Sequence, residues 1–377
     1  MTAHVFIVDK DTFPVHLQYQ FAGIGAKKYS DIDFNDSPFT GLNSKVEIIL
    51  TKMMADISRI RKNDRILFYV QSKPGQEGKF FGIFRAAEDF AFIDEGAKYL
   101  YDELGKYLTF RTLFVPDKVY PQGVTEWNAL DEIRSIDKPH KMMWSLIYRK
   151  LKGHRGCTMV TPYEEERICK LISDGQTPIN NFASLDFDIN ARTIIASDKL
   201  SCHYQAEKIP FSLMPRMITK HNKGNLYEAF LQAEISRTIG RENDQLSKIL
   251  LNDSKIVWLG NEIGCGVGMQ SIDIMLAYED PHYHVMPIEL KSVPADAIHI
   301  KQIKRYVDWI EQYYLPNHSA TIVPVLITRK SNTMFPNNFM SAVNKFNNEK
   351  SSKTCQDLRL VEFKITSSGI EYSLANI

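Results

Sequence analysis

The chain has little that suits a membrane, an oxidising compartment or a nucleotide-driven motor. Its 377 residues contain no apolar run close to the roughly 18 residues that span a bilayer. Its five cysteines are scattered and form no C-x-x-C pair, so neither a zinc ribbon nor a disulfide framework is indicated. No G-x-x-x-x-G-K-[ST] phosphate loop is present. The first residues lack a basic segment followed by a hydrophobic core, so we expect a cytoplasmic protein with no membrane partner.

The chain also lacks an excess of charge of either sign. Its formal net charge is +1, which by itself says nothing about nucleic acid, and its length suggests two domains. Basic residues do cluster locally, and such patches suffice for contacts with DNA phosphates, although solvated helix faces would look the same. The candidates for contact with the DNA backbone are Arg149, Lys150, Lys152, Arg155, Lys220, Lys223, Lys301, Lys304 and Arg305.

Two carboxylates stand out because each lies at the centre of a short apolar stretch. Asp273 is flanked by isoleucines in Ser271–Met275, and Glu289 is followed by Leu290 and Lys291. Both stretches predict strands, whose side chains alternate between the two faces of a sheet. If the strands pair, Asp273, Glu289 and Lys291 meet on one face. Two carboxylates and an ammonium do not suit a hydrophobic core. They are typical of a site that binds a hard cation next to a residue that stabilises charge.

Two flanking helices add polar residues to this pattern. Glu228 shares the apolar face of a predicted helix with Leu231 and Ile235, and a carboxylate there needs a partner, which a metal would supply. After Lys291, Gln302 and Tyr306 lie one helical turn apart.

Along the chain these residues follow in the order Glu228, Asp273, Glu289-Leu290-Lys291 and then Gln302 and Tyr306. This order resembles that of the PD-(D/E)XK nucleases. The Q-x-x-x-Y spacing of Gln302 and Tyr306 is similar to their RecB-like branch. The resemblance implies a mixed sheet flanked by helices over residues 221–377. It implies Mg²⁺ as the cofactor, with Mn²⁺ able to substitute, and DNA cleavage by phosphodiester hydrolysis. The implied metal ligands are Asp273, Glu289, Glu228 and the carbonyl of Leu290. Lys291 would stabilise charge, and Gln302 and Tyr306 would orient the DNA or the strand.

The first 170 residues predict strands with interspersed helices. A strand is expected at Val5–Val8, an amphipathic helix at 45–61 and further strands at 65–70, 80–87 and 108–115. Lys62–Tyr69, followed by a turn and Gly82, resembles the EVE/YTH branch of the PUA-like β-barrels, with Asn63 in place of the usual Gly. Some other small α+β domain is the alternative. Residues 171–220 are expected to connect the two domains.

The EVE/YTH resemblance implies an aromatic pocket that holds a modified base turned out of its helix. The candidate rings are Phe21, Phe39, Tyr69, Phe84 and Trp127, for each of which core packing is the alternative.

Together, the two resemblances predict a modification-dependent endonuclease that acts on double-stranded DNA, with a homodimer supplying two active sites. One alternative is a repair nuclease for mismatched or branched DNA with the same catalytic core. The other is a non-catalytic nucleic-acid-binding protein with a degenerate nuclease fold, against which the intact Asp273, Glu289 and Lys291 argue.

Overall fold

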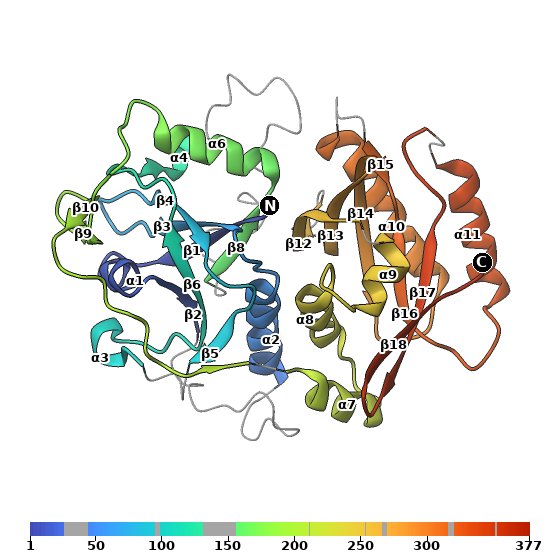
Figure 1. Ribbon diagram of the computed structural model, residues 1–377. Helices are drawn as coiled ribbons and strands as arrows, with labels where there is room; N and C mark the ends of the chain where they lie inside the picture. The colour runs from blue at the N-terminus through green and yellow to red at the C-terminus, as the bar shows by residue number, and fades with distance from the viewer. Residues whose placement is uncertain are drawn as a thin grey trace. The chain divides into compact units, whose positions relative to one another are not determined.

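The computed structural model describes residues 1–25, 44–94, 99–130, 156–210, 212–252, 254–265, 270–315, 320–350 and 353–377. They form two compact units, one of described residues up to 210 and one that begins at Ser212 (Figure 1). Each unit is a mixed α/β structure built on its own sheet, as the sequence predicts. The range 171–220, predicted as a connector, is divided between the units. In the described ranges, no helix is long and apolar enough to cross a membrane.

The first unit is organised around a curled sheet. Its strands lie in the order β11-β5-β6-β4-β3-β1-β8, and β2 and β7 pair with β6 and β4. The elements are β1 (Ala3–Val8), α1 (Phe13–Tyr19), β2 (Phe21–Ile24), α2 (Ser44–Ser58), β3 (Arg65–Val70), β4 (Lys79–Ala86), β5 (Phe92–Asp94), α3 (Tyr101–Leu104), β6 (Phe110–Pro116), β7 (Val124–Thr125), α4 (Glu126–Leu130), β8 (Cys157–Val160), α6 (Pro162–Ser173), β9 (Ser184–Asp188), β10 (Thr193–Ser197) and β11 (Lys208–Ile209). The predicted strand at Val5–Val8, the helix at 45–61 and the strands at 65–70, 80–87 and 108–115 are confirmed, with ends shifted by a few residues.

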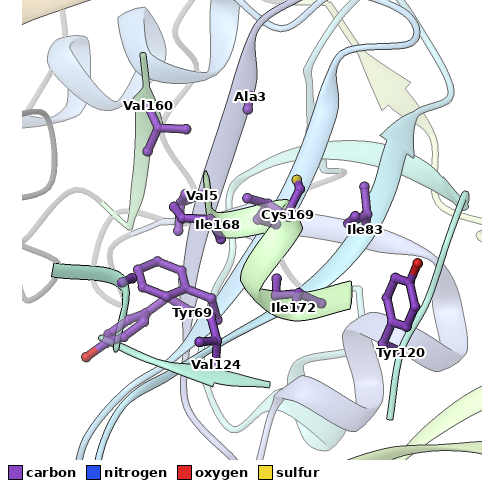
Figure 2. Close-up of a cluster of buried hydrophobic side chains, with 13 residues drawn as sticks. Ala3, Val5, Tyr69, Ile83, Tyr120, Val124, Val160, Ile168, Cys169 and Ile172 are labelled. Atoms are coloured by element: carbon purple, nitrogen blue, oxygen red, sulfur yellow. The ribbon is translucent and has the colours of Figure 1, made fainter. Parts of the chain in front are cut away.

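Strand β3 is buried on both faces, and this explains its continuous apolar sequence. On one face, the ring of Phe68 packs 5.1 Å from Phe13 of α1 and 5.5 Å from Phe84 of β4, measured between centroids. On the other face, Tyr69 lies in a cluster covered by Ile168 and Ile172 of α6 (Figure 2). The sheet of the first unit is therefore a middle layer.

Helix α6 begins where its sequence provides a complete N-terminal cap. The Glu164 amide donates to the Thr161 hydroxyl (3.3 Å), and the Glu164 carboxylate accepts from the Thr161 amide (2.6 Å). Pro162 occupies the first turn, where its missing N–H is not needed. The cap fixes the residue at which α6 begins.

The second unit holds a mixed sheet in the order β12-β13-β14-β16-β17-β18, with β15 paired to β14. The pairs from β12 to β14 and from β17 to β18 are antiparallel, whereas β14, β16 and β17 run parallel. Helices α10 and α11 pack side by side (Figure 1). The elements are α7 (Met214–Asn222), α8 (Glu228–Thr238), α9 (Gln245–Leu251), β12 (Ile256–Gly264), β13 (Ser271–Asp280), β14 (His282–Lys291), α10 (Ala297–Trp309), a π-helical turn (Ile310–Tyr314), β15 (Ala320–Ile322), β16 (Val325–Arg329), α11 (Asn337–Glu349), β17 (Arg359–Thr366) and β18 (Gly369–Leu374).

Strands β13 and β14 are longer than the sequence predicts. Only Pro281 separates them, so His282 and His284 are strand residues. The His284 ring stacks on Tyr278 at 4.8 Å between centroids. Residues 285–290 of β14 are all buried, and this run shows that both faces of the strand are covered.

His16 of α1 is a buried histidine with a structural role. Its Nδ1 lies 2.8 Å from the Phe21 carbonyl oxygen, to which it donates. Burial lowers the pKa of His16 to about 3, against the opposing effect of this hydrogen bond. The ring is therefore neutral in the folded chain, whereas an unfolded histidine takes up a proton below about pH 6.5.

We expect acid to destabilise the chain through His16. Because its pKa is lowered on folding, the stability it confers is complete above the unfolded pKa and is lost as the pH falls below it. Between pH 7 and pH 5 the loss is about 2 kcal/mol for one such residue. Urea titrations of the full chain at both pH values measure it. His16→Asn keeps a hydrogen-bond donor but cannot titrate, so its free energy of unfolding should fall less between pH 7 and pH 5 than that of the wild type. Equal falls in the two proteins would contradict this account.

Candidate active site

The candidate site lies where β13 and β14 part. Their antiparallel pairing runs from Asp280–His282 to Ile274–Ile288, although β13 extends back to Ser271 and β14 extends on to Lys291. At the next position, the Asp273 carboxylate accepts a hydrogen bond from the Leu290 amide, with Oδ2 2.8 Å from the nitrogen. The Asp273 side chain thus accepts a hydrogen bond from β14 just beyond the last backbone pair of the two strands.

Glu289 is almost fully buried, and both of its carboxylate oxygens have partners. Oε1 lies 2.5 Å from Nζ of Lys291, and Oε2 lies 2.7 Å from the hydroxyl of Tyr306 on α10. That hydroxyl also lies 3.0 Å from the Ser271 carbonyl oxygen. Because a phenol has one proton, Tyr306 donates to one of the two oxygens at a time. The arrangement fixes Glu289 in one rotamer between α10 and its own strand.

The ammonium of Lys291 is kept charged by its surroundings. Burial alone would lower the pKa of Lys291, but the charge of Glu289 and the hydrogen bond to it outweigh burial, and the pKa is raised. Lys291 therefore suits the role of a fixed positive charge rather than that of a base.

Asp273 is in the opposite situation. Loss of solvation is the main effect that raises the pKa of this carboxyl well above its ordinary value, and the charges of Glu289 and Glu228 add to it. The Leu290 amide and Lys291 oppose the rise without cancelling it. When ionised, the carboxylates of Asp273, Glu289 and Glu228 outnumber the one ammonium of Lys291 among them, an arrangement that suits a bound cation.

Glu228, the first residue of α8, joins the site from a helix. Its Oε1 accepts from the amide of Ser292 at 3.3 Å and from its hydroxyl at 3.4 Å. Ser292 directly follows Lys291, so Glu228 contacts the chain just beyond β14. Sequence reasoning missed Ser292, because a single serine after a strand is an ordinary residue.

Of the six predicted catalytic residues, the structure brings five together. The sixth, Gln302, lies half-buried on α10 one turn before Tyr306, and its side chain makes no hydrogen bond with any described residue. A further residue, Gln232, was not predicted. It lies one turn after Glu228 on α8, and its side-chain nitrogen donates to the Asp273 carbonyl oxygen at 2.7 Å. That spacing on one helix face was the available sequence indication.

The oxygen donors of the site fit a hard cation. Asp273, Glu289 and Glu228 provide carboxylates and Leu290 a backbone carbonyl, which are ligand types that Mg²⁺ prefers. No three His, Cys, Asp or Glu side chains are grouped as a ready-made metal site anywhere in the described residues. Glu289 in particular is engaged by Lys291 and Tyr306. The donor types thus suit Mg²⁺, whereas the side chains are not grouped around one position in this structure.

The basic residues predicted to contact DNA are placed in part. Lys301, Lys304 and Arg305 are exposed on α10, with Lys304 bonded to Asp308 at 2.8 Å. Lys223 is exposed after α7. Lys220 lies on α7, with its ammonium 5.2 Å from the ring centroid of Phe230. Arg149, Lys150, Lys152 and Arg155 lie outside the described residues.

Among the described residues, the rings predicted to form the base pocket do not line an open pocket together. Phe21, Tyr69 and Phe84 are completely buried in the core of the first unit, so their rings present no open face to a base. Tyr69, for example, lies in the cluster beneath α6 (Figure 2). Trp127 is 49% exposed, and Phe39 lies outside the described residues.

Compared with known proteins, the chain matches no family model and no curated protein. Among solved structures, it is similar to a hypothetical protein from Leishmania major, with 11% identity and a TM-score of 0.29 over 46% of this chain and 96% of that one. It is also similar to Rpa0253 from Rhodopseudomonas palustris, with 16% identity and a TM-score of 0.26 over 46% of this chain and 93% of that one. A third match is human THYN1, solved in complex with DNA containing 5-methylcytosine, with 8% identity and a TM-score of 0.27 over 46% of this chain and 99% of that one. Scores this low assign the chain to no family.

We expect Asp273→Asn to stabilise the chain in the absence of metal. The pKa of Asp273 is raised on folding, so its contribution to stability is present at low pH and is lost as the pH rises through the folded value. Asparagine cannot ionise, and its side-chain oxygen still accepts from Leu290. In EDTA at pH 8, the variant should melt above the wild-type chain, and this gain should shrink as the pH falls.

The matched control is Glu371→Gln, which neutralises an exposed acid on β18 of the same sheet. A lower melting temperature for Asp273→Asn than for this control at pH 8 would contradict the charge imbalance inferred for the site.

Proposed function

We propose that the chain is a metal-dependent endonuclease that hydrolyses DNA phosphodiester bonds. One observation carries this proposal: Asp273, Glu289 and Lys291 meet where β13 and β14 part. A structural role would not require two buried acids and an ammonium at one sheet end, because burying charges is costly unless each is paired. The resemblance of the motif order to the PD-(D/E)XK nucleases supports the same reaction.

Hydrolysis forms a bond between a water oxygen and phosphorus and breaks the bond to one sugar oxygen, which leaves with a proton. In this proposal, the Lys291 ammonium stabilises the charge that grows on the phosphate oxygens. Glu289 holds Lys291 in place, and Tyr306 holds Glu289. When bound, Mg²⁺ supplies a Lewis acid that polarises the phosphate. The residues that would hold it are Asp273, Glu289, Glu228 and, through its carbonyl, Leu290.

We further propose that the substrate is double-stranded DNA that carries a modified base and that the first unit reads the modification. The resemblance of residues 1–170 to EVE/YTH domains supports this, together with the curled sheet of that unit. The base would have to be read by side chains other than Phe21, Tyr69 and Phe84. Cutting both strands requires two active sites, so the proposal includes a homodimer.

We expect DNA cleavage by the full chain to depend on Mg²⁺ or Mn²⁺ and to stop in EDTA. Asp273→Ala and Glu289→Ala should abolish it. Lys291→Ala should lower the single-turnover rate by about 10²–10³-fold, the usual cost of removing one preorganised charge stabiliser. Lys345→Ala, which removes an exposed lysine on α11, is the matched control and should cleave at the wild-type rate. Cleavage by the wild type in EDTA, or undiminished cleavage by Asp273→Ala, would overturn the assignment.

We expect the full chain to prefer DNA with a modified base. Duplexes of one sequence would differ only in carrying cytosine, 5-methylcytosine, 5-hydroxymethylcytosine or its glucosylated form. One added group in an apolar pocket is worth about 1–3 kcal/mol, so the preferred form should be cut roughly 10–200-fold faster than plain DNA. Equal cutting of all four duplexes, with faster cutting of a mismatched one, would favour a repair nuclease instead.

A further inference from the structure

We propose that Gln232 is a positioning residue of this site and that, through Gln232 and Glu228, helix α8 holds β13 and the end of β14 apart. The inference rests on the proposed function, because it assigns Gln232 the task of fixing Asp273 for a bound cation.

Asp273 lies at a break in the register of β13 with both neighbouring strands. The pairing of β13 with β14 ends at Ile274–Ile288. The pairing of β13 with β12 passes from Asn261–Ile274 to Ile263–Ile272 and skips Asp273. Between Asn261 and Ile263 of β12 lies Glu262, whose φ of 48° is in the left-handed region.

Gln232 supplies a side-chain partner for the backbone of Asp273. Its side-chain nitrogen donates to the Asp273 carbonyl oxygen at 2.7 Å, and the residue is only 4% exposed. The Asp273 carboxylate accepts from Leu290 at the same time. Asp273 is therefore held at its backbone from α8 and at its side chain from β14, and these two contacts define where the carboxylate lies.

Helix α8 contacts the end of the other strand as well. Glu228 lies one turn before Gln232, so the two side chains share a face of the helix. Glu228 accepts from the amide and hydroxyl of Ser292, just beyond Lys291. Phe230, Leu231 and Ile235 of α8 are buried, so the helix that carries both contacts is itself anchored in the core.

An amide suits this position because it is neutral. A lysine or arginine could also donate to the Asp273 carbonyl, but its charge would compete with a cation for the carboxylates. A glutamate would lose the donor and add repulsion to a site that already has excess negative charge. Glutamine fixes the backbone without changing the charge of the site, so it affects cation binding through position alone.

The test compares Gln232→Met, which keeps the length of the side chain and removes the donor, with Gln245→Met. Gln245 donates to the Tyr372 carbonyl of β18 at 2.9 Å and accepts from the Tyr372 amide at 3.0 Å, so its variant loses the same kind of contact, and one more, with the same sheet away from the site. Circular dichroism and melting curves first establish that both variants fold. Calorimetry with Mn²⁺ alone then measures cation affinity independently of cleavage, and single-turnover assays follow cutting.

We expect Gln232→Met to weaken Mn²⁺ binding and to slow cleavage by about 10–100-fold, the usual cost of losing a residue that positions a metal ligand. Gln245→Met should change neither. Equal Mn²⁺ affinity and rate in Gln232→Met and Gln245→Met, beside an active wild type, would overturn this inference alone. A wild-type chain that neither binds Mn²⁺ nor cleaves would overturn the proposed function and this inference with it.

Discussion

The hydrogen bond from the Leu290 amide to the Asp273 carboxylate is the contact on which the candidate site depends. It lies where a further backbone hydrogen bond would otherwise continue the pairing of β13 with β14. Because the strands part there, Asp273 faces the end of β14 rather than a sheet surface. Glu289 and Lys291 lie on that same stretch and complete the group.

The groups around this bond destabilise the fold unless they are paired. A buried carboxylate without a partner is among the costliest features of a protein interior. Glu289 has two partners, Lys291 and Tyr306, whereas the Asp273 carboxylate accepts from a backbone amide. The long buried run of β14, with α8 and α10 packed against the strand, supplies the rigidity that keeps these charges in place. The core thus supports an arrangement that local interactions alone would not maintain.

The sequence predicts this part of the fold well because its pattern is local. An acid between isoleucines points away from their face of the strand, so Asp273 and Glu289 are expected on one face if the two strands pair. Alternation cannot show that β13 and β14 part, and it cannot show that an amide on α8 reaches the Asp273 backbone. Gln232 was missed for that reason: its role depends on a contact between residues 41 positions apart.

The aromatic residues show the opposite case. Tyr69 alternates with Phe68 along β3, and the sequence cannot say whether the second face of that strand is open or covered. In the structure, α6 covers it, so Tyr69 is a core residue (Figure 2). The helix itself could be recognised from Thr161, Pro162 and Glu164, but the face on which it packs is a tertiary property.

The hairpin that links Asp273 to Glu289 has a consequence for how this chain can vary in length. Residues 274–288 hold the two acids at one end of a ladder whose other end is the turn at Pro281. Residues added to the turn leave the register unchanged. A single residue added within either strand moves the acid beyond it to the opposite face. Related chains that keep this site should therefore differ in hairpin length by matched pairs, one residue in each strand, or by changes confined to the turn.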